Sequence, residues 1–179
     1  MSKALKSLAL IFVLLTVIFS VMYLCIRIKL FLSLAITFGT TAYHFCMRLI
    51  IGLTLNSAMK NKADYTRKWY RIKPWEKKLY KAIKVKKWKN RMPTYNKSFF
   101  DITRHNWDEI AQASCQAEIV HEIIVVFSFL PIVFSIWFGD FPVFLITSIV
   151  AALFDLLFVI MQRYNRPRIL RMIGLKKQR

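Results

Sequence analysis

Four long runs of apolar residues alternate with polar and basic segments along this chain of 179 residues. A run of about 20 apolar residues is long enough for a helix to cross a lipid bilayer. The pattern therefore predicts four transmembrane helices, at about 5–26, 30–55, 119–138 and 143–161. The expected fold class is an all-α integral membrane protein with one membrane domain over 1–179. For the first run, a cleaved signal peptide is the alternative interpretation.

The basic residues predict how these spans are oriented. The segment 58–117 holds 16 Lys and Arg, and residues 163–179 hold seven more. The sequence GDFP at 139–142 has none, and it is short enough to join the last two spans as a tight antiparallel hairpin. Because cytoplasmic loops of membrane proteins are enriched in Lys and Arg, we expect the basic loop 58–117, the basic tail 162–179 and both termini to be cytoplasmic.

Capping residues and prolines predict where helices begin and end. Asn106 and Glu109 have the spacing of a capping box, so we expect a helix to begin near Trp107 and to run without a break into the third span. Pro131 is expected to kink that helix. Pro167 disfavours helical backbone at the residue before it, so we expect the fourth helix to end there.

The segment WEKKLYKAIKVKKWKNRM, residues 75–92, has apolar and aromatic residues at helical spacing. This pattern predicts an amphipathic helix that lies on the membrane and presents its lysines to anionic lipid headgroups. We expect Pro93 to end it. The spans and this segment together predict four transmembrane helices with a basic amphipathic cytoplasmic segment between spans two and three.

Composition narrows the class of partner. The chain has 28 Lys and Arg against 9 Asp and Glu, a net charge of +19, yet 56% of its residues are hydrophobic. Charge alone would fit nucleic acid, but basic loops between apolar spans favour anionic lipid headgroups, and we expect no nucleic acid partner. The three scattered cysteines form neither a disulfide pattern nor a metal-ligand pattern. We therefore expect no metal and no bound cofactor.

Two charged residues lie inside predicted spans. Arg48 and Asp155 are each about eight residues from the cytoplasmic end of their span. A charge within a bilayer costs at least ~2.5 kcal/mol and tends to be paired. Equal depth therefore predicts a buried Arg48–Asp155 ion pair that holds the second span against the fourth.

The hairpin also brings two polar motifs together. His121 lies about 20 residues before the turn and Arg163 about 22 residues after it, and each residue adds 1.5 Å to a helix. The motifs AEIVHE (117–122) and QRYNRPR (162–168) should therefore meet at the cytoplasmic end of one helix pair.

This meeting point is the candidate site. Glu118 and His121 are three residues apart, hence on one helix face, as a carboxylate that orients a general base would be. Arg163, Asn165 and Arg166 could bind a phosphate or stabilise an oxyanion. The alternative is that the glutamates only neutralise these arginines as a structural clamp.

Three blocks in order, WEKKLYKAIKVKKWKNRMP, QAEIVHE and QRYNRPRILRM, resemble the bacterial glycosyl-4,4'-diaponeurosporenoate acyltransferase family. The resemblance covers about residues 74–173, and the chain departs from the family pattern at Asn90 and Glu122. The residues that fit the pattern are Trp75, Glu76, Tyr80, Lys86, Trp88, Lys89, Pro93, Glu118, His121 and 162–168.

The resemblance implies a multi-pass enzyme of the bacterial cell membrane that transfers a fatty acyl group to a hydroxyl of a glycolipid, such as the glucose of a glycosylated carotenoid. The donor would be an acyl thioester, acyl coenzyme A or acyl carrier protein. The expected catalytic residues are His121 and Glu118. The expected substrate-binding residues are Gln162, Arg163, Tyr164, Asn165, Arg166, Arg168, Lys86, Trp88 and Lys89. The competing hypothesis is a small non-enzymatic membrane protein that binds anionic lipid or a partner membrane protein; the oligomeric state stays open.

Overall fold

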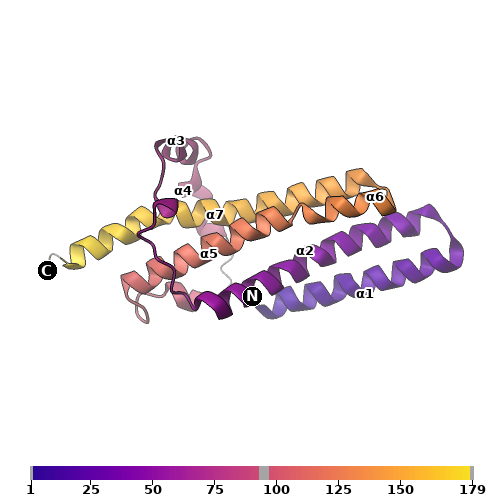
Figure 1. Ribbon diagram of the computed structural model, residues 1–179, viewed down its shortest axis with the longest axis horizontal. Helices are drawn as coiled ribbons and strands as arrows, with labels where there is room; N and C mark the ends of the chain where they lie inside the picture. The colour runs from indigo at the N-terminus through magenta and orange to yellow at the C-terminus, as the bar shows by residue number, and fades with distance from the viewer. Residues whose placement is uncertain (1, 93–96, 178–179) are drawn as a thin grey trace. The chain divides into compact units, whose positions relative to one another are not determined.

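The computed structural model describes residues 2–92 and 97–177, and every regular element within these ranges is a helix (Figure 1). The long helices are α1 (Ser2–Ile26), α2 (Lys29–Met59), α5 (Trp107–Phe127) and α7 (Phe141–Lys177). Four stretches are long and apolar enough to cross a membrane, namely Lys3–Ile26, Lys29–Met59, Trp107–Phe138 and Phe141–Leu175. The predicted all-α class with four helices of membrane length is confirmed.

The chain folds into two compact units. Unit 1 contains Met1–Leu53 and Ile123–Asp155, and unit 2 contains Thr54–Glu122 and Leu156–Arg179. Helices α2, α5 and α7 each contribute to both units. Each unit therefore has its own packing, and the single membrane domain stays a prediction.

In unit 1, α1 and α2 form an antiparallel hairpin (Figure 1). Arg27 ends α1 in the left-handed conformation at φ 60°, while its N–H still donates to the Tyr23 carbonyl at 2.8 Å. Aromatic rings pack between the two helices, with centroid distances of 6.2 Å for Phe12–Phe38 and 5.3 Å for Phe19–Phe38. Ring packing of this kind needs no polar partner and suits an apolar surrounding.

Helix α5 runs from Trp107 into the third span without a break, as predicted, but the rest of that span is interrupted after Phe127. After α5 comes the 3-10 helix η4 (Leu130–Phe134), and then the short helix α6 (Ser135–Phe138). The cause is Pro131, which has no N–H to donate to the carbonyl of Phe127. That carbonyl instead accepts a hydrogen bond of 2.9 Å from the hydroxyl of Tyr43 on α2. The predicted effect of Pro131 is thus confirmed, and a neighbouring helix satisfies the carbonyl that it leaves unpaired.

The sequence GDFP forms the predicted tight turn between α6 and α7. Gly139 has φ 72° and Asp140 has φ 49°, and both values lie in the left-handed region that reverses a chain within few residues. The carbonyl of Asp140 then accepts from the N–H of Val143 at 2.9 Å, which starts α7.

The predicted pair Arg48–Asp155 is present in unit 1. Arg48 Nε donates to Asp155 Oδ2 at 2.8 Å, and Nη2 pairs with the same oxygen and donates to the carbonyl of Ala151 at 3.2 Å. Ser33 Oγ donates to Asp140 Oδ2 at 2.8 Å. Both side-chain pairs join residues 107 apart, so α2 and α7 run parallel in a constant register.

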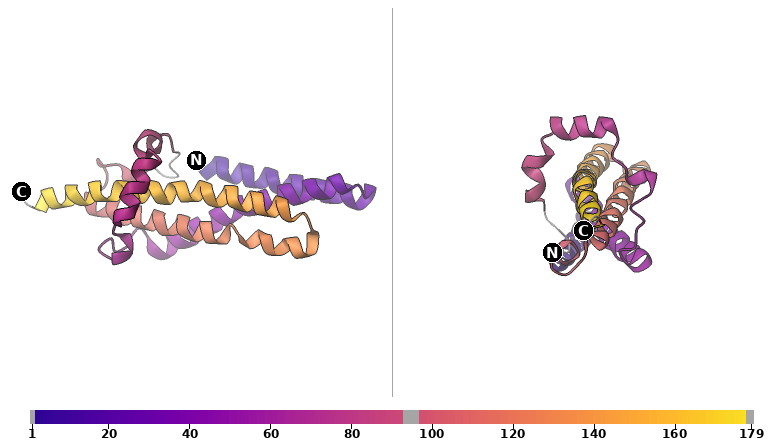
Figure 2. Two further views of the ribbon diagram at one scale, coloured as in Figure 1. Left: turned by 90° about the horizontal axis from the view of Figure 1, so that it is seen from above. Right: turned by 90° about the vertical axis from the view of Figure 1, so that its left-hand side faces the viewer.

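In unit 2, the segment between α2 and α5 wraps around the part of α7 that begins at Leu156 (Figure 2). Its helices are η1 (Lys68–Tyr70), α3 (Pro74–Ala82), α4 (Val85–Trp88), η2 (Lys89–Arg91) and η3 (Lys97–Phe100).

The single amphipathic helix expected over 75–92 is therefore wrong. Lys84, at φ 52°, breaks it into α3 and α4. The bend lets Glu76 of α3 and Lys89 after α4 both reach α7 by hydrogen bonds, so contacts between elements outweigh the periodicity. Pro93 lies outside the described residues.

The predicted start of α5 near Trp107 is confirmed. The predicted end of α7 before Pro167 is wrong. Asn106 Oδ1 accepts from the Glu109 N–H at 2.8 Å, and Glu109 Oε2 accepts from the Asn106 N–H at 3.1 Å, the reciprocal bonds of a capping box. Helix α7, however, continues through Pro167 to Lys177. A proline inside a helix costs about 3 kcal/mol. Arg163 and Arg166, on the turn before Pro167, form buried ion pairs with Glu76 and Glu118 that hold this part of α7 against α3 and α5.

Candidate functional site

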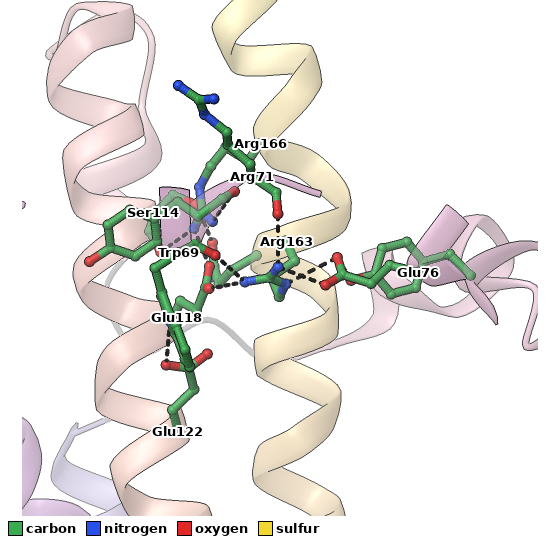
Figure 3. A network of polar contacts seen from close by, with 11 residues as sticks. Trp69, Arg71, Glu76, Ser114, Glu118, Glu122, Arg163 and Arg166 are labelled. Atoms are coloured by element: carbon green, nitrogen blue, oxygen red, sulfur yellow. Dashed lines mark hydrogen bonds and ion pairs between the residues drawn. The ribbon is translucent and has the colours of Figure 1, made fainter. Parts of the chain in front are cut away.

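Arg163 of α7 is the centre of a buried polar network in unit 2. Its Nη1 pairs with Glu118 Oε1 at 2.6 Å, and its Nη2 pairs with Glu76 Oε1 at 2.7 Å. Its Nε also donates to Glu76 Oε2 at 3.2 Å. Arg163 thus lies between a glutamate of α5 and a glutamate of α3 (Figure 3). The predicted meeting of the two motifs across the helix pair is confirmed at this contact.

Arg166 makes the second half of the network. Its Nη2 forms an ion pair with Glu118 Oε2, so each oxygen of that carboxylate faces a guanidinium group. The Arg166 guanidinium also lies over the ring of Tyr70, 4.9 Å from its centroid. Glu118 is fully buried and Arg166 is 1% exposed. Charges this deep remain ionised only when they are paired, because the loss of hydration costs several kcal/mol for each ion.

The two arginines also hold the backbone around η1. Arg163 donates to the carbonyls of Trp69 and Arg71, both at 3.2 Å, and Arg166 donates to that of Tyr70 at 3.4 Å. Three consecutive carbonyls are therefore satisfied by side chains of α7. Burial raises the pKa of the Tyr70 phenol to about 12, and the charge of Glu118 adds to that rise.

The other polar residues of QRYNRPR have separate partners. Gln162 Oε1 accepts from Ser114 Oγ at 3.0 Å, and Asn165 Oδ1 accepts from Lys89 Nζ at 2.6 Å. The Tyr164 ring packs edge-on against Tyr80, with centroids 5.9 Å apart. The motif therefore contacts α5, α3 and the segment after α4 within two turns of one helix.

Tyr80 connects this packing to the ion pairs. Its hydroxyl donates to Glu76 Oε2 at 3.1 Å. Burial, and then the negative charge of Glu76, raise the pKa of the Tyr80 phenol to about 12, so it remains a donor at neutral pH.

The network is electrically balanced. Two buried arginines face two buried carboxylates, those of Glu76 and Glu118. That Arg163 and Arg166 bind a phosphate stays a prediction. In the structure, both guanidinium groups are already engaged by carboxylates.

His121 lies one turn beyond Glu118 on α5. Its ring stacks on that of Phe158 of α7, with centroids 4.5 Å apart and planes 7° apart. Glu122 accepts a hydrogen bond of 3.1 Å from Trp69 Nε1. Of the predicted catalytic pair, Glu118 therefore lies inside the arginine network with both oxygens on guanidinium groups, and His121 stacks on Phe158 one turn further along α5.

Two open pockets lie in unit 2, and Pro167 borders both. One, of about 360 Å³, is mostly aromatic and aliphatic and includes Tyr70 and Leu170. The other, of about 380 Å³, is lined by Lys86, Lys89, Tyr164, Pro167, Arg168 and Arg171. Trp88 is near the second pocket in sequence, but its Nε1 donates to the Ile83 carbonyl at 3.0 Å and supports the bend between α3 and α4.

The sequence predicted no site role for Glu76, the one acid of α3, although Glu76 bonds to both Arg163 and Tyr80. Glu76 is the one carboxylate between Asp64 and Asp101 in a strongly basic segment. That isolation is a signal that could have found it, because an acid among lysines that is also buried needs a specific partner. Ser114 and Phe158 carried no comparable signal.

Within residues 2–92 and 97–177, no three His, Cys, Asp or Glu side chains gather closely enough to hold a metal ion. The polar centre of unit 2 is therefore built from guanidinium, carboxylate, amide and phenol groups.

These features define an all-helical protein with four helices of membrane length and a buried, charge-balanced polar centre. The chain belongs to the glycosyl-4,4'-diaponeurosporenoate acyltransferase family, whose model matches residues 66–175, more than half of the chain. That range contains η1, α3, α4 and the whole arginine network. No curated protein and no solved structure matches the chain.

Proposed function

We propose that this protein is a membrane acyltransferase that moves a fatty acyl group from a thioester donor to a hydroxyl of a glycolipid, possible acceptors including the glucose of a glycosylated carotenoid. The observation that carries the proposal is the convergence, in unit 2, of the polar residues of the family-matched region around Arg163. The four helices of membrane length support a location in the bacterial cell membrane, with the basic segment and both termini in the cytoplasm.

The reaction joins the acceptor oxygen to the acyl carbon. The hydroxyl oxygen attacks the thioester carbonyl while His121 takes the hydroxyl proton. The tetrahedral intermediate then breaks its C–S bond, and the thiolate that leaves takes the proton from His121. The products are one ester and one free thiol, so the step needs no oxidant or reductant.

The arginine network would hold the site in place for this reaction. Glu118 anchors α5 to α7 one turn before His121, and His121 rests on the ring of Phe158. This arrangement favours a fixed position for the imidazole, which is what a general base needs.

One observation favours the non-enzymatic alternative. The buried arginines are fully matched by carboxylates, as in a clamp that only holds helices together. In that case His121 would be a packing residue, and the protein would bind anionic lipid or a partner membrane protein.

A substitution of His121 separates the two functions. His121→Phe keeps an aromatic ring on Phe158 but removes both ring nitrogens. We expect product formation to fall by about 10²–10⁴-fold, the usual contribution of a general base. Lipid mass spectrometry would compare cells with the gene, without it, and with each variant, at equal protein abundance measured by immunoblot.

His105→Phe is the matched control, because His105 is half-exposed and bonds to Glu109 of the capping box. It should leave the lipid profile unchanged. A lipid profile that is the same with and without the gene would reject the acyltransferase. Full activity of His121→Phe would reject His121 as the base.

A further inference from the structure

The positive charges of unit 2 fall into two groups with different surroundings. Arg163 and Arg166 are buried against carboxylates. Lys86, Lys89, Arg168 and Arg171 instead line the pocket of about 380 Å³, whose lining contains no carboxylate. Among the described residues, none of these four forms an ion pair. We call them the pocket cations.

Lys89 is the best fixed of the pocket cations. Its Nζ donates to Asn165 Oδ1 at 2.6 Å and lies 5.2 Å from the centroid of the Tyr164 ring. Both partners are neutral. Burial lowers the pKa of Lys89, and the positive charge of Arg168 lowers it further. An anion bound beside these two residues would relieve that repulsion.

The continuation of α7 through Pro167 creates this pocket. Tyr164, Arg168 and Arg171 are at positions i, i+4 and i+7, which lie on one face of a continuous helix. If the helix ended before Pro167, the two arginines would not line up with Tyr164. Lys86 and Lys89 come from the opposite wall, which the bend at Lys84 turns toward α7.

We infer that this pocket binds the phosphate groups of the acyl donor, and that the donor is a coenzyme A thioester. This inference rests on the proposed acyl transfer. Coenzyme A carries a diphosphate and a separate 3′-phosphate, which need several cations at different points. Arginine forks and lysine ammonium groups are the usual partners of phosphate oxygens. The pocket volume lies in the range of small-ligand sites.

The first experiment measures binding without turnover. The full chain, in nanodiscs of phosphatidylcholine, is titrated calorimetrically with coenzyme A, with dephospho-coenzyme A, which lacks the 3′-phosphate, and with pantetheine, which has no phosphate. We expect affinity to fall in that order. Pantetheine that binds as tightly as coenzyme A would overturn the inference.

A matched pair of double variants locates the site. Lys86→Gln with Arg171→Gln removes two pocket cations, and Lys77→Gln with Lys78→Gln removes two exposed lysines of α3 that do not line the pocket. The first pair should lower the affinity for coenzyme A by at least about tenfold, the scale of a charge-assisted contact. The second pair should leave that affinity nearly unchanged. Equal losses in both pairs would indicate a general effect of net charge and would overturn the pocket.

Two further arms distinguish other sources of phosphate. If the pocket holds a lipid headgroup, nanodiscs containing phosphatidylglycerol would abolish coenzyme A binding. If it holds the phosphopantetheine of an acyl carrier protein, that protein would bind and coenzyme A would not. Either result would overturn the coenzyme A assignment.

The same variants separate this inference from the proposed function. If coenzyme A binds to the pocket but deletion of the gene leaves the lipids of the cell unchanged, the pocket is supported and the acyl transfer is rejected. If deletion removes a lipid product but coenzyme A does not bind, the acyl transfer is supported and the pocket assignment is rejected.

Discussion

Each unit of the molecule contains an arginine paired with a buried carboxylate, yet the two arrangements differ in what they connect. In unit 1, Arg48 pairs with Asp155 and joins two helices that run in parallel register. In unit 2, Arg163 and Arg166 pair with two glutamates and also hold three backbone carbonyls.

The difference teaches what each set of charges does. A single pair between apolar helices fixes their register, because any shift would leave two charges without partners. A network that also binds loop backbone fixes an irregular segment, which has too few helical hydrogen bonds to hold itself in place. Unit 1 therefore has the simpler polar core, and unit 2 has a polar core able to shape a binding site.

Removal of Arg163 should lower stability more than the other substitutions proposed for the two units. Arg163→Met leaves Glu76 without its guanidinium partner and removes one of the two partners of Glu118. The loss of one member of a buried pair costs about 3–5 kcal/mol. We expect the midpoint of thermal unfolding in detergent to drop sharply. Arg171→Met, at an exposed position of the same helix, is the control and should unfold like the original protein. Equal midpoints for the two variants would show that the network does not stabilise unit 2.

Reversal of the charges in unit 1 should have the next largest effect. Arg48→Asp or Asp155→Arg alone places two like charges against each other between α2 and α7, and an unpaired charge within a bilayer costs at least ~2.5 kcal/mol. Protein abundance in the membrane should fall for each single variant and recover when both are combined. No recovery in the double variant would mean that the pair does not hold α2 against α7.

Removal of the Tyr80 hydroxyl should have the smallest effect of the three. Tyr80→Phe removes its hydrogen bond to Glu76 but leaves Glu76 paired with Arg163, so we expect a loss of about 1 kcal/mol in unfolding free energy. Tyr164→Phe is the control, because Tyr164 contacts Tyr80 and Lys89 with its ring, which the substitution keeps. Denaturant titration would measure both, and a loss as large as that of Arg163→Met would reject this ranking.

Local signals in the sequence predicted much of the framework. Apolar run lengths located the four long helices, Asn106 and Glu109 located the start of α5, and GDFP located the turn. Counting residues from that turn predicted the meeting of Glu118 with Arg163, because helical rise is constant.

Helix breaks and continuations were harder to predict, because they depend on partners far away in the chain. Lys84 bends the basic segment although nothing in its neighbours breaks a helix, and α7 passes through Pro167 although proline usually ends one. In both places, contacts between elements outweigh the local preference of the backbone.

The amino-acid sequence by itself determined the helical class, the basic and apolar zones and the residues that carry charge, since these follow from composition and spacing. Only the tertiary structure decided which charges neutralise each other. Glu76 and Glu118 take Arg163 and Arg166, which leaves the pocket cations without a carboxylate. Pairing depends on distance and burial in three dimensions, and residues up to 96 positions apart in the chain meet in this network.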